Sequence, residues 1–249
     1  MSHRIKVIIP IPMDQAGADN RASQLSESFI LPGFHPEFVP VAKGASLGDS
    51  AYDVLLMDFS VVEAGLRAQE EGYSAVCIDT VSDSGLAALR SRLDIPVIAP
   101  GMAAFHMACM LGKKFSVITM WDEWFPLYEK TLTEYHLWPR VASLRSIKTR
   151  PDLTELLEGK EDVVFAKLEA EARRAMDEDG ADVIVLGSTT MHKSHAYLTE
   201  RLPIPVINPG LVSYKLCEMF LSLGLTHSRK AYPAPENLND AAYHGFAGQ

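Results

Sequence analysis

Two stretches rich in hydroxyl side chains follow buried, strand-like runs of this chain. One reads Thr80-Val81-Ser82-Asp83-Ser84-Gly85 and the other reads Ser188-Thr189-Thr190-Met191. A loop that enters a helix presents free backbone N–H groups and the positive end of the helix dipole, so it favours a carboxylate or an imide oxygen. The alternative is that Ser82, Asp83 and Ser84 only cap the following helix. Because two loops share this character, we favour a small anionic or polar ligand.

An internal repeat places these two loops at equivalent positions. The stretch 71–80, which continues to Ile-Pro-Val-Ile-Ala-Pro-Gly at 95–101, recurs at 179–188 and continues to Ile-Pro-Val-Ile-Asn-Pro-Gly at 204–210. Both copies contain a glycine, a buried strand, a hydroxyl-rich loop and a helix in the same order. The repeat therefore pairs Thr80 with Ser188.

Strands and helices alternate along both halves of the chain, which predicts parallel sheets. The expected strands are 6–10, 38–42, 75–79, 97–99, 115–119, 141–146, 182–186 and 206–208. The expected helices are 50–71, 84–93, 102–111, 124–135, 162–179, 193–202 and 211–221. The strands are continuous apolar runs, as is typical of sheets covered by helices on both faces.

These elements predict an α/β fold of two pseudo-twofold-related lobes, each a flavodoxin-like four-stranded parallel sheet flanked by helices. We expect one lobe to comprise residues 1–101 and 212–249 and the other residues 102–211. Ligands of such sheets bind outside the carboxyl ends of the strands, so we expect the site to lie between the lobes. The predicted substrate-binding residues are those that begin these loops, namely Pro10, Ile11, Lys43, Ser46, Val81, Ser82, Thr119, Arg145, Thr189 and Thr190.

Composition narrows the partners of this chain. Its 249 residues carry a net charge of −9, which disfavours nucleic acid. No apolar run is long enough for a signal peptide or a membrane-spanning helix, so we expect a cytoplasmic protein. Cys77, Cys109 and Cys217 lie in apolar runs and are expected to be reduced, structural thiols. The sequence has no dinucleotide, P-loop or paired-cysteine motif, which indicates chemistry without a cofactor.

Two further side chains could act as bases near these loops. His192 follows Ser188 by four residues, so its imidazole could reach that hydroxyl, although His192 and His195 could equally form an exposed helix face. A metal site at this pair is not favoured, because the sequence offers no third ligand. Glu123 follows a strand and could be a carboxylate base, although Asp122 as an N-cap beside packing tryptophans explains the same segment.

Basic residues at strand ends and one further histidine have a structural and a functional interpretation each. Lys43 and Arg145 end strands and could pair with a substrate carboxylate, or they could be surface charges. His106 lies just after the first Pro-Gly and is expected to be a helix residue without a catalytic role.

The sequence resembles the Asp/Glu/hydantoin racemase superfamily, most closely its hydantoin and allantoin racemase branch. The resemblance rests on the order and spacing of five features: the strand ending at Pro10, the Gly-Ala-Ser-Leu loop at 44–47, the turn at 82–86, the strand 115–119, and the run 183–187 followed by Ser188 and Met191. It implies a racemase-type enzyme, commonly a homo-oligomer, that takes a proton from a substrate carbon and returns one.

The resemblance also implies that Thr80 and Ser188 occupy the positions of the family's two catalytic cysteines. A thiol can be tuned to act as a base near neutral pH, whereas an alcohol needs a neighbouring base. We therefore expect an enzyme that acts on a small carboxylate, carbonyl compound or hydantoin-like cyclic ureide through an enolate-like state, without the usual pair of cysteines. The alternatives are a hydrolase or lyase that uses Ser188 or Thr80, and a non-catalytic protein that binds a small ligand.

Overall fold

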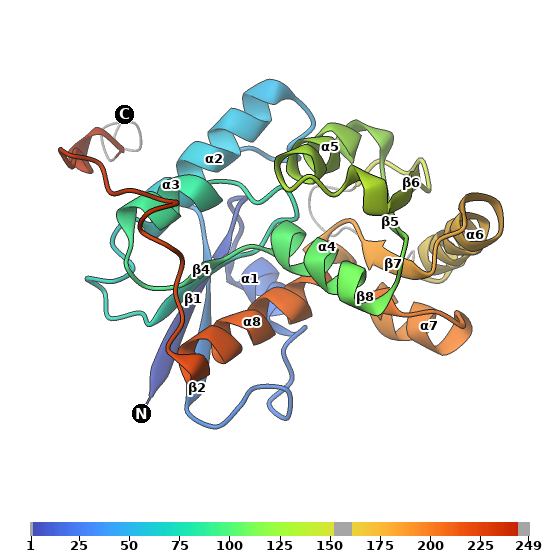
Figure 1. Cartoon of the computed structure of the whole chain (residues 1–249), viewed down its shortest axis with the longest axis horizontal. Coiled ribbons are helices and arrows are strands. Elements are labelled where there is room, and N and C mark those ends of the chain that lie inside the picture. The colour runs from blue at the N-terminus through green and yellow to red at the C-terminus, as the bar shows by residue number, and fades with distance from the viewer. Residues whose placement is uncertain (1, 152–160, 244–249) are drawn as a thin grey trace. The chain divides into compact units, whose positions relative to one another are not determined.

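The computed structural model describes residues 2–151 and 161–243 and contains two parallel sheets with the same strand order (Figure 1). The first sheet has the order β2-β1-β3-β4 and the second has the order β6-β5-β7-β8. The strands of the first are β1 (His3–Ile9), β2 (Phe34–Pro40), β3 (Ala75–Ile78) and β4 (Val97–Ile98). Those of the second are β5 (Phe115–Thr119), β6 (Val141–Ser146), β7 (Val183–Leu186) and β8 (Val206–Ile207). The shared order confirms the predicted fold class and gives β3 and β7 equivalent, central places.

Helices connect successive strands in both halves of the chain. In the first they are α1 (Gln15–Ala22), α2 (Ala51–Gly65) and α3 (Leu86–Arg92), and in the second α4 (Pro100–Leu111), α5 (Phe125–Glu134), α6 (Glu161–Asp179) and α7 (Ser194–Arg201). Among the described residues the last helix is α8 (Pro209–Leu223), and short 3₁₀ helices lie at η1 (Asp122–Trp124), η2 (Trp138–Arg140) and η3 (Thr189–Met191). Figure 1 shows α2 beside α3 and α6 beside α7. Both α4 and α8 begin at the proline of a Pro-Gly pair, where a missing N–H costs no helical hydrogen bond.

The described residues form two compact units. One contains the residues up to Ala99 together with those from Ser213, and the other runs from Pro100 to Val212. We call them lobe 1 and lobe 2. The strands β3 and β7 are buried along their whole length, so each lobe has its own apolar core around its central strands.

Three elements differ from the sequence-based expectations. The second strand begins at Phe34 and not at residue 38. The prolines at 36 and 40 made this segment look unlike a strand in the sequence, but β2 is an edge strand, where proline is tolerated. The helix expected at 50–71 ends at Gly65, which packs so closely that an added Cβ would lie 2.7 Å from Leu89. Helix α1 was not predicted, because only Ala18 and Arg21 of its residues are buried and no apolar stripe marks it.

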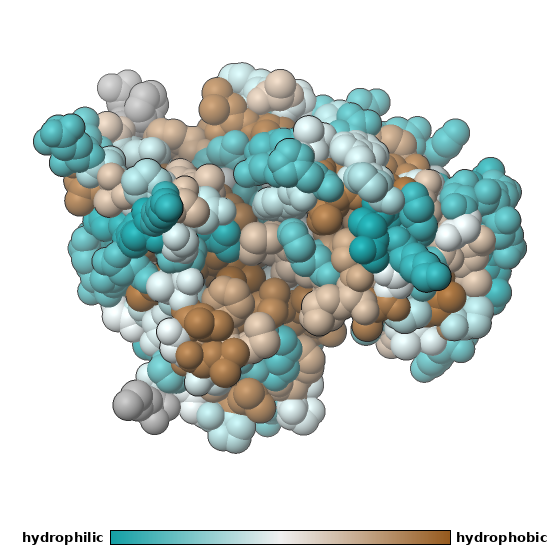
Figure 2. Space-filling view, in the orientation of Figure 1, coloured by the Kyte–Doolittle hydropathy of each residue, from teal (hydrophilic) through white to brown (hydrophobic). Residues whose placement is uncertain are grey.

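The described surface includes an apolar area on α8. Figure 2 shows apolar surface over the C-terminal part of this helix, where Met219 and Leu223 are 44% and 63% exposed. No helix in the described part of the chain is both long and apolar enough to cross a membrane.

Candidate functional site

The hydroxyl loop of lobe 1 follows the carboxyl end of β3. The Oγ1 of Thr80 lies 2.9 Å from the Oγ of Ser82, which lies 2.9 Å from the Oγ of Ser84. Thr80 is partly exposed, whereas Ser82 and Ser84 are buried. The loop therefore carries a row of three bonded hydroxyls that runs from an accessible position into the protein.

The backbone of this loop has a specific shape that the sequence encodes. Asp83 and Gly85 have φ angles of +52° and +73°. The backbone N–H of Gly85 donates to Asp58 on α2 at 3.0 Å, and a Cβ on Gly85 would lie 2.9 Å from Val62. Gly85 itself is the N-cap residue of α3 and has no side chain with which to cap that helix end. The Asp58 carboxylate, from another helix, accepts the N–H of this cap residue.

The hydroxyl loop of lobe 2 follows β7 at the equivalent place. The Oγ of Ser188 lies 2.7 Å from the Oγ1 of Thr190 and also accepts a hydrogen bond from the Thr190 backbone N–H at 3.2 Å. Ser188 thereby caps η3. Ser188 and Thr190 are partly exposed, while Thr189 is buried. Each lobe thus presents a bonded pair of hydroxyls, Thr80 with Ser82 and Ser188 with Thr190, two residues apart in each case.

The imidazole of His192 contacts the backbone of its own loop. Its Nδ1 lies 3.3 Å from the carbonyl oxygen of Thr189. The Ser188 hydroxyl lies 2.7 Å from that of Thr190, and the action of His192 as a base for Ser188 stays a prediction. His195 bonds through Nε2 to the carbonyl of Val206 at 3.1 Å, which ties α7 to β8.

The other predicted side chains occupy varied environments. Glu123 is exposed on η1, and the adjacent Asp122 accepts a hydrogen bond from the hydroxyl of Ser146. Lys43 and Ser46 are exposed, Ile11 is partly exposed, and Pro10 and Val81 are buried.

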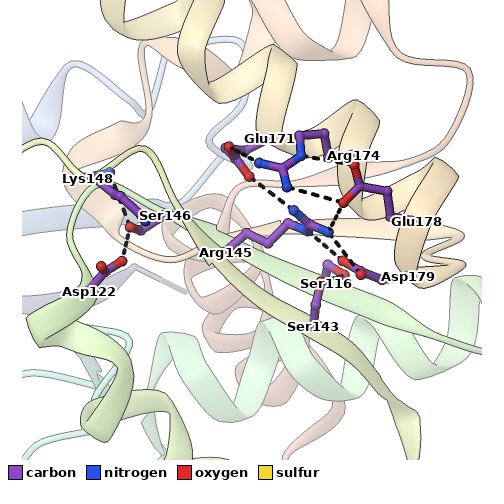
Figure 3. Close-up of polar contacts among 10 residues, drawn as sticks. All are labelled: Ser116, Asp122, Ser143, Arg145, Ser146, Lys148, Glu171, Arg174, Glu178 and Asp179. Atoms are coloured by element: carbon purple, nitrogen blue, oxygen red, sulfur yellow. Dashed lines mark hydrogen bonds and ion pairs between the residues drawn. The ribbon is translucent and has the colours of Figure 1, made fainter.

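Arg145 belongs to an ionic network with α6 (Figure 3). Its guanidinium donates to both carboxylate oxygens of Asp179, at 2.5 and 2.9 Å, and also to Glu171 and Glu178. The hydrogen bond from Arg145 lowers the pKa of Asp179 below its ordinary value. Three carboxylates on one helix pair with this guanidinium and connect α6 to β6, while a substrate contact of Arg145 stays a prediction.

Thr119 is fully buried and bonds within lobe 2. Its Oγ1 lies 2.8 Å from the phenol oxygen of Tyr128, which donates to the backbone carbonyl of Gly187 at 2.7 Å. In lobe 1 the residue equivalent to Gly187 is Asp79, which forms a buried ion pair in which Arg21 donates to its carboxylate at 2.5 and 2.8 Å. Sequence analysis did not single out Tyr128, Arg21 or Asp79. A carboxylate that ends a buried strand was the available signal, since a buried charge requires a partner.

A metal site is not formed by the described residues, among which no group of three or more His, Cys, Asp or Glu side chains could hold an ion. The two loops offer hydroxyls and the backbone N–H groups of their residues. Such donors bind oxyanions and stabilise charge that develops on a carbonyl oxygen.

Lobe 1 and lobe 2 together define an α/β protein with a hydroxyl-bearing loop after the third strand of each sheet. A sequence model of the family described as Asp/Glu/Hydantoin racemase matches residues 21–217. The chain therefore belongs to the Asp/Glu/hydantoin racemase family, and it is an enzyme of racemase type.

Individual relatives agree with this membership. A hydantoin racemase from Pseudomonas sp. (strain NS671) is 31% identical over 189 residues, which cover 76% of this chain and 75% of that protein. The solved allantoin racemase from Klebsiella pneumoniae has a TM-score of 0.86 and 28% identity, with 95% of each chain covered. The allantoin racemase from Pseudomonas fluorescens has a TM-score of 0.84 and 26% identity, with 95% of this chain and 98% of that chain covered.

Proposed function

We propose that this enzyme exchanges the proton on a carbon next to a carbonyl group in a small cyclic ureide of the hydantoin type. The observation that carries the proposal is the pair of bonded hydroxyls at the end of the third strand in each lobe. The names of the relatives, hydantoin racemase and allantoin racemase, support a cyclic ureide as the substrate class.

The loop hydroxyls are suited to hold the substrate's oxygens. A base takes the proton from the substrate carbon, and the electron pair of that C–H bond moves toward the neighbouring carbonyl oxygen to form an enolate; the candidate bases in this chain are His192 and Glu123. A hydroxyl donor aimed at that oxygen stabilises the charge, and removing one such donor typically slows an enzyme about 100-fold or more. We assign Thr80, Ser82, Ser188 and Thr190 to this role, because each carries a hydroxyl in a bonded loop pair.

The same hydroxyls are poorly suited to act as the proton-accepting base. An alcohol accepts a proton only beside an activating base. The contact of His192 with the Thr189 carbonyl oxygen involves only Nδ1, one of its two ring nitrogens. The hydroxyls therefore act as donors to the enolate.

Solvent deuterium uptake tests this proposal directly. The enzyme is incubated in deuterated buffer with single enantiomers of 5-substituted hydantoins and allantoin, and with aspartate, glutamate and substituted malonates, while proton NMR follows the signal of the exchanging carbon. We expect enzyme-dependent loss of that signal with a cyclic ureide. Binding of these compounds without exchange would support the non-catalytic alternative, and hydrolysis products without exchange would support a hydrolase.

A further inference from the structure

In both lobes, a buried side chain holds the peptide group immediately before the loop hydroxyl. In lobe 2 this peptide group is that of Gly187, whose carbonyl accepts a hydrogen bond from Tyr128 at 2.7 Å. Tyr128 lies on α5, the first α-helix after β5, and is 1% exposed. The contact thus connects the helix to the residue that directly precedes Ser188.

The direction of the hydrogen bonds in lobe 2 follows from proton counting. A phenol has one proton, and Tyr128 donates it to Gly187, so the hydroxyl of Thr119 must donate to the phenol oxygen. Burial raises the pKa of Tyr128, which keeps this proton in place. Gly187 makes the approach possible, because an added Cβ would lie 2.7 Å from the phenol oxygen and 2.8 Å from the Cβ of Thr119.

Lobe 1 has a different side chain in the equivalent role. Arg21 lies on α1, the helix that follows β1, and its Nη2 donates to the backbone carbonyl of Asp79 at 3.1 Å. The same guanidinium donates twice to the carboxylate of Asp79, and both side chains are buried. Asp79 directly precedes Thr80, as Gly187 precedes Ser188.

We propose that Arg21 and Tyr128 are positioning residues that fix the backbone ahead of Thr80 and Ser188 and thereby aim the two loop hydroxyls. The inference rests on the proposed function only in that the aimed hydroxyls bind substrate. The two lobes use unrelated side chains, an arginine and a tyrosine, to donate to the carbonyl group just before the loop hydroxyl. This shared contact indicates a role in fixing the loop and not in general packing. A displaced donor near a reacting atom can cost roughly 100-fold in rate.

The test uses Tyr128→Phe with Tyr197→Phe as the matched control. Tyr197→Phe loses one phenol hydrogen bond in lobe 2, to Glu169 at the helix surface, whereas Tyr128→Phe loses two, of which one is to the loop at Gly187. Amide hydrogen exchange of residues 187–191 is measured relative to the amides of β8. We expect Tyr128→Phe to speed exchange in this loop about tenfold, the factor that loss of one hydrogen bond gives, and Tyr197→Phe to leave it unchanged.

Activity gives a second, independent result. Where the wild type exchanges substrate protons, Tyr128→Phe should lower kcat about 100-fold with little change in KM, because an aimed donor acts on the transition state. Thr119→Val removes the donor to the phenol but keeps the hydrogen bond from Tyr128 to Gly187, so it should lower kcat less, by about tenfold, and Thr119→Ser, which keeps the hydroxyl, should retain the wild-type rate. These two variants also serve if Tyr128→Phe does not fold.

Arg21→Lys is the corresponding variant in lobe 1, with the exposed Arg67→Lys as its control. Arg21→Lys should speed amide exchange at residues 80–82 and leave exchange at residues 187–191 unchanged, and Arg67→Lys should change neither. Unchanged loop exchange in Tyr128→Phe and Arg21→Lys would overturn the positioning role whatever the activity. An inactive wild type with the expected loop exchange would refute the proposed function and leave the positioning role standing.

Discussion

Asp79→Asn should destabilise lobe 1 far more than the same substitution at a solvent-exposed ion pair. The carboxylate of Asp79 and the guanidinium of Arg21 are 2% and 6% exposed, and they share two side-chain hydrogen bonds. Removing one partner of such a pair leaves an uncompensated buried charge, which costs about 3–5 kcal/mol. In a protein of this size 1 kcal/mol lowers Tm by about 2–4 °C, so the expected loss is roughly 6–20 °C.

The assay is thermal and urea unfolding followed by circular dichroism, with Asp94→Asn as the control. Asp94 also pairs with an arginine, Arg229, but its side chain is 72% exposed, so its loss should cost about 1 kcal/mol or less. Equal stability of the two variants would refute the view that burial makes the Arg21–Asp79 pair important.

Three other outcomes follow from the same structure. The double variant Thr80→Cys/Ser188→Cys should gain proton exchange by tenfold or more above about pH 8, where thiolates form, and no gain would show that the loops do not face the substrate carbon. Arg145→Met should lower stability at pH 7 and flatten its decline in acid. The pKa of Asp179 is depressed in the folded state, so the stability from this pair is present above the unfolded pKa of about 3.9 and is lost as pH falls through the folded pKa; an unchanged acid profile in urea unfolding would contradict this. Gly187→Ala should cost about 1–3 kcal/mol by crowding the buried phenol, measured by urea unfolding, and a stability equal to wild type would contradict that close approach.

The internal repeat explains why much of the fold could be predicted from the sequence. Repetition of a strand, a loop and a helix followed by Pro-Gly establishes the equivalence of β3 with β7, and parallel pairing then follows from the alternation of elements. Local patterns could not show two elements. Helix α1 has no apolar stripe, and the edge strand β2 contains prolines that are typical of a loop.

Side-chain partners were predictable only where they are close in sequence. The pairing of Ser188 with Thr190 spans two residues and could be expected from the loop composition. Arg21 and Asp79 are 58 residues apart, so no periodicity relates them. Arg145 is a similar case, because its carboxylate partners Glu178 and Asp179 on α6 lie 33 and 34 residues further along the chain.

The role of the loop hydroxyls is tested most directly by the rate of solvent deuterium uptake into a hydantoin by the wild type, Thr80→Val and Ser188→Ala. Ser222→Ala serves as control, since its hydroxyl bonds a helix carbonyl on α8. We predict measurable uptake by the wild type and by the control, and a loss of about 100-fold in each loop variant with Tm little changed. Uptake by both loop variants at the wild-type rate would contradict the assignment of Thr80 and Ser188 to the active site.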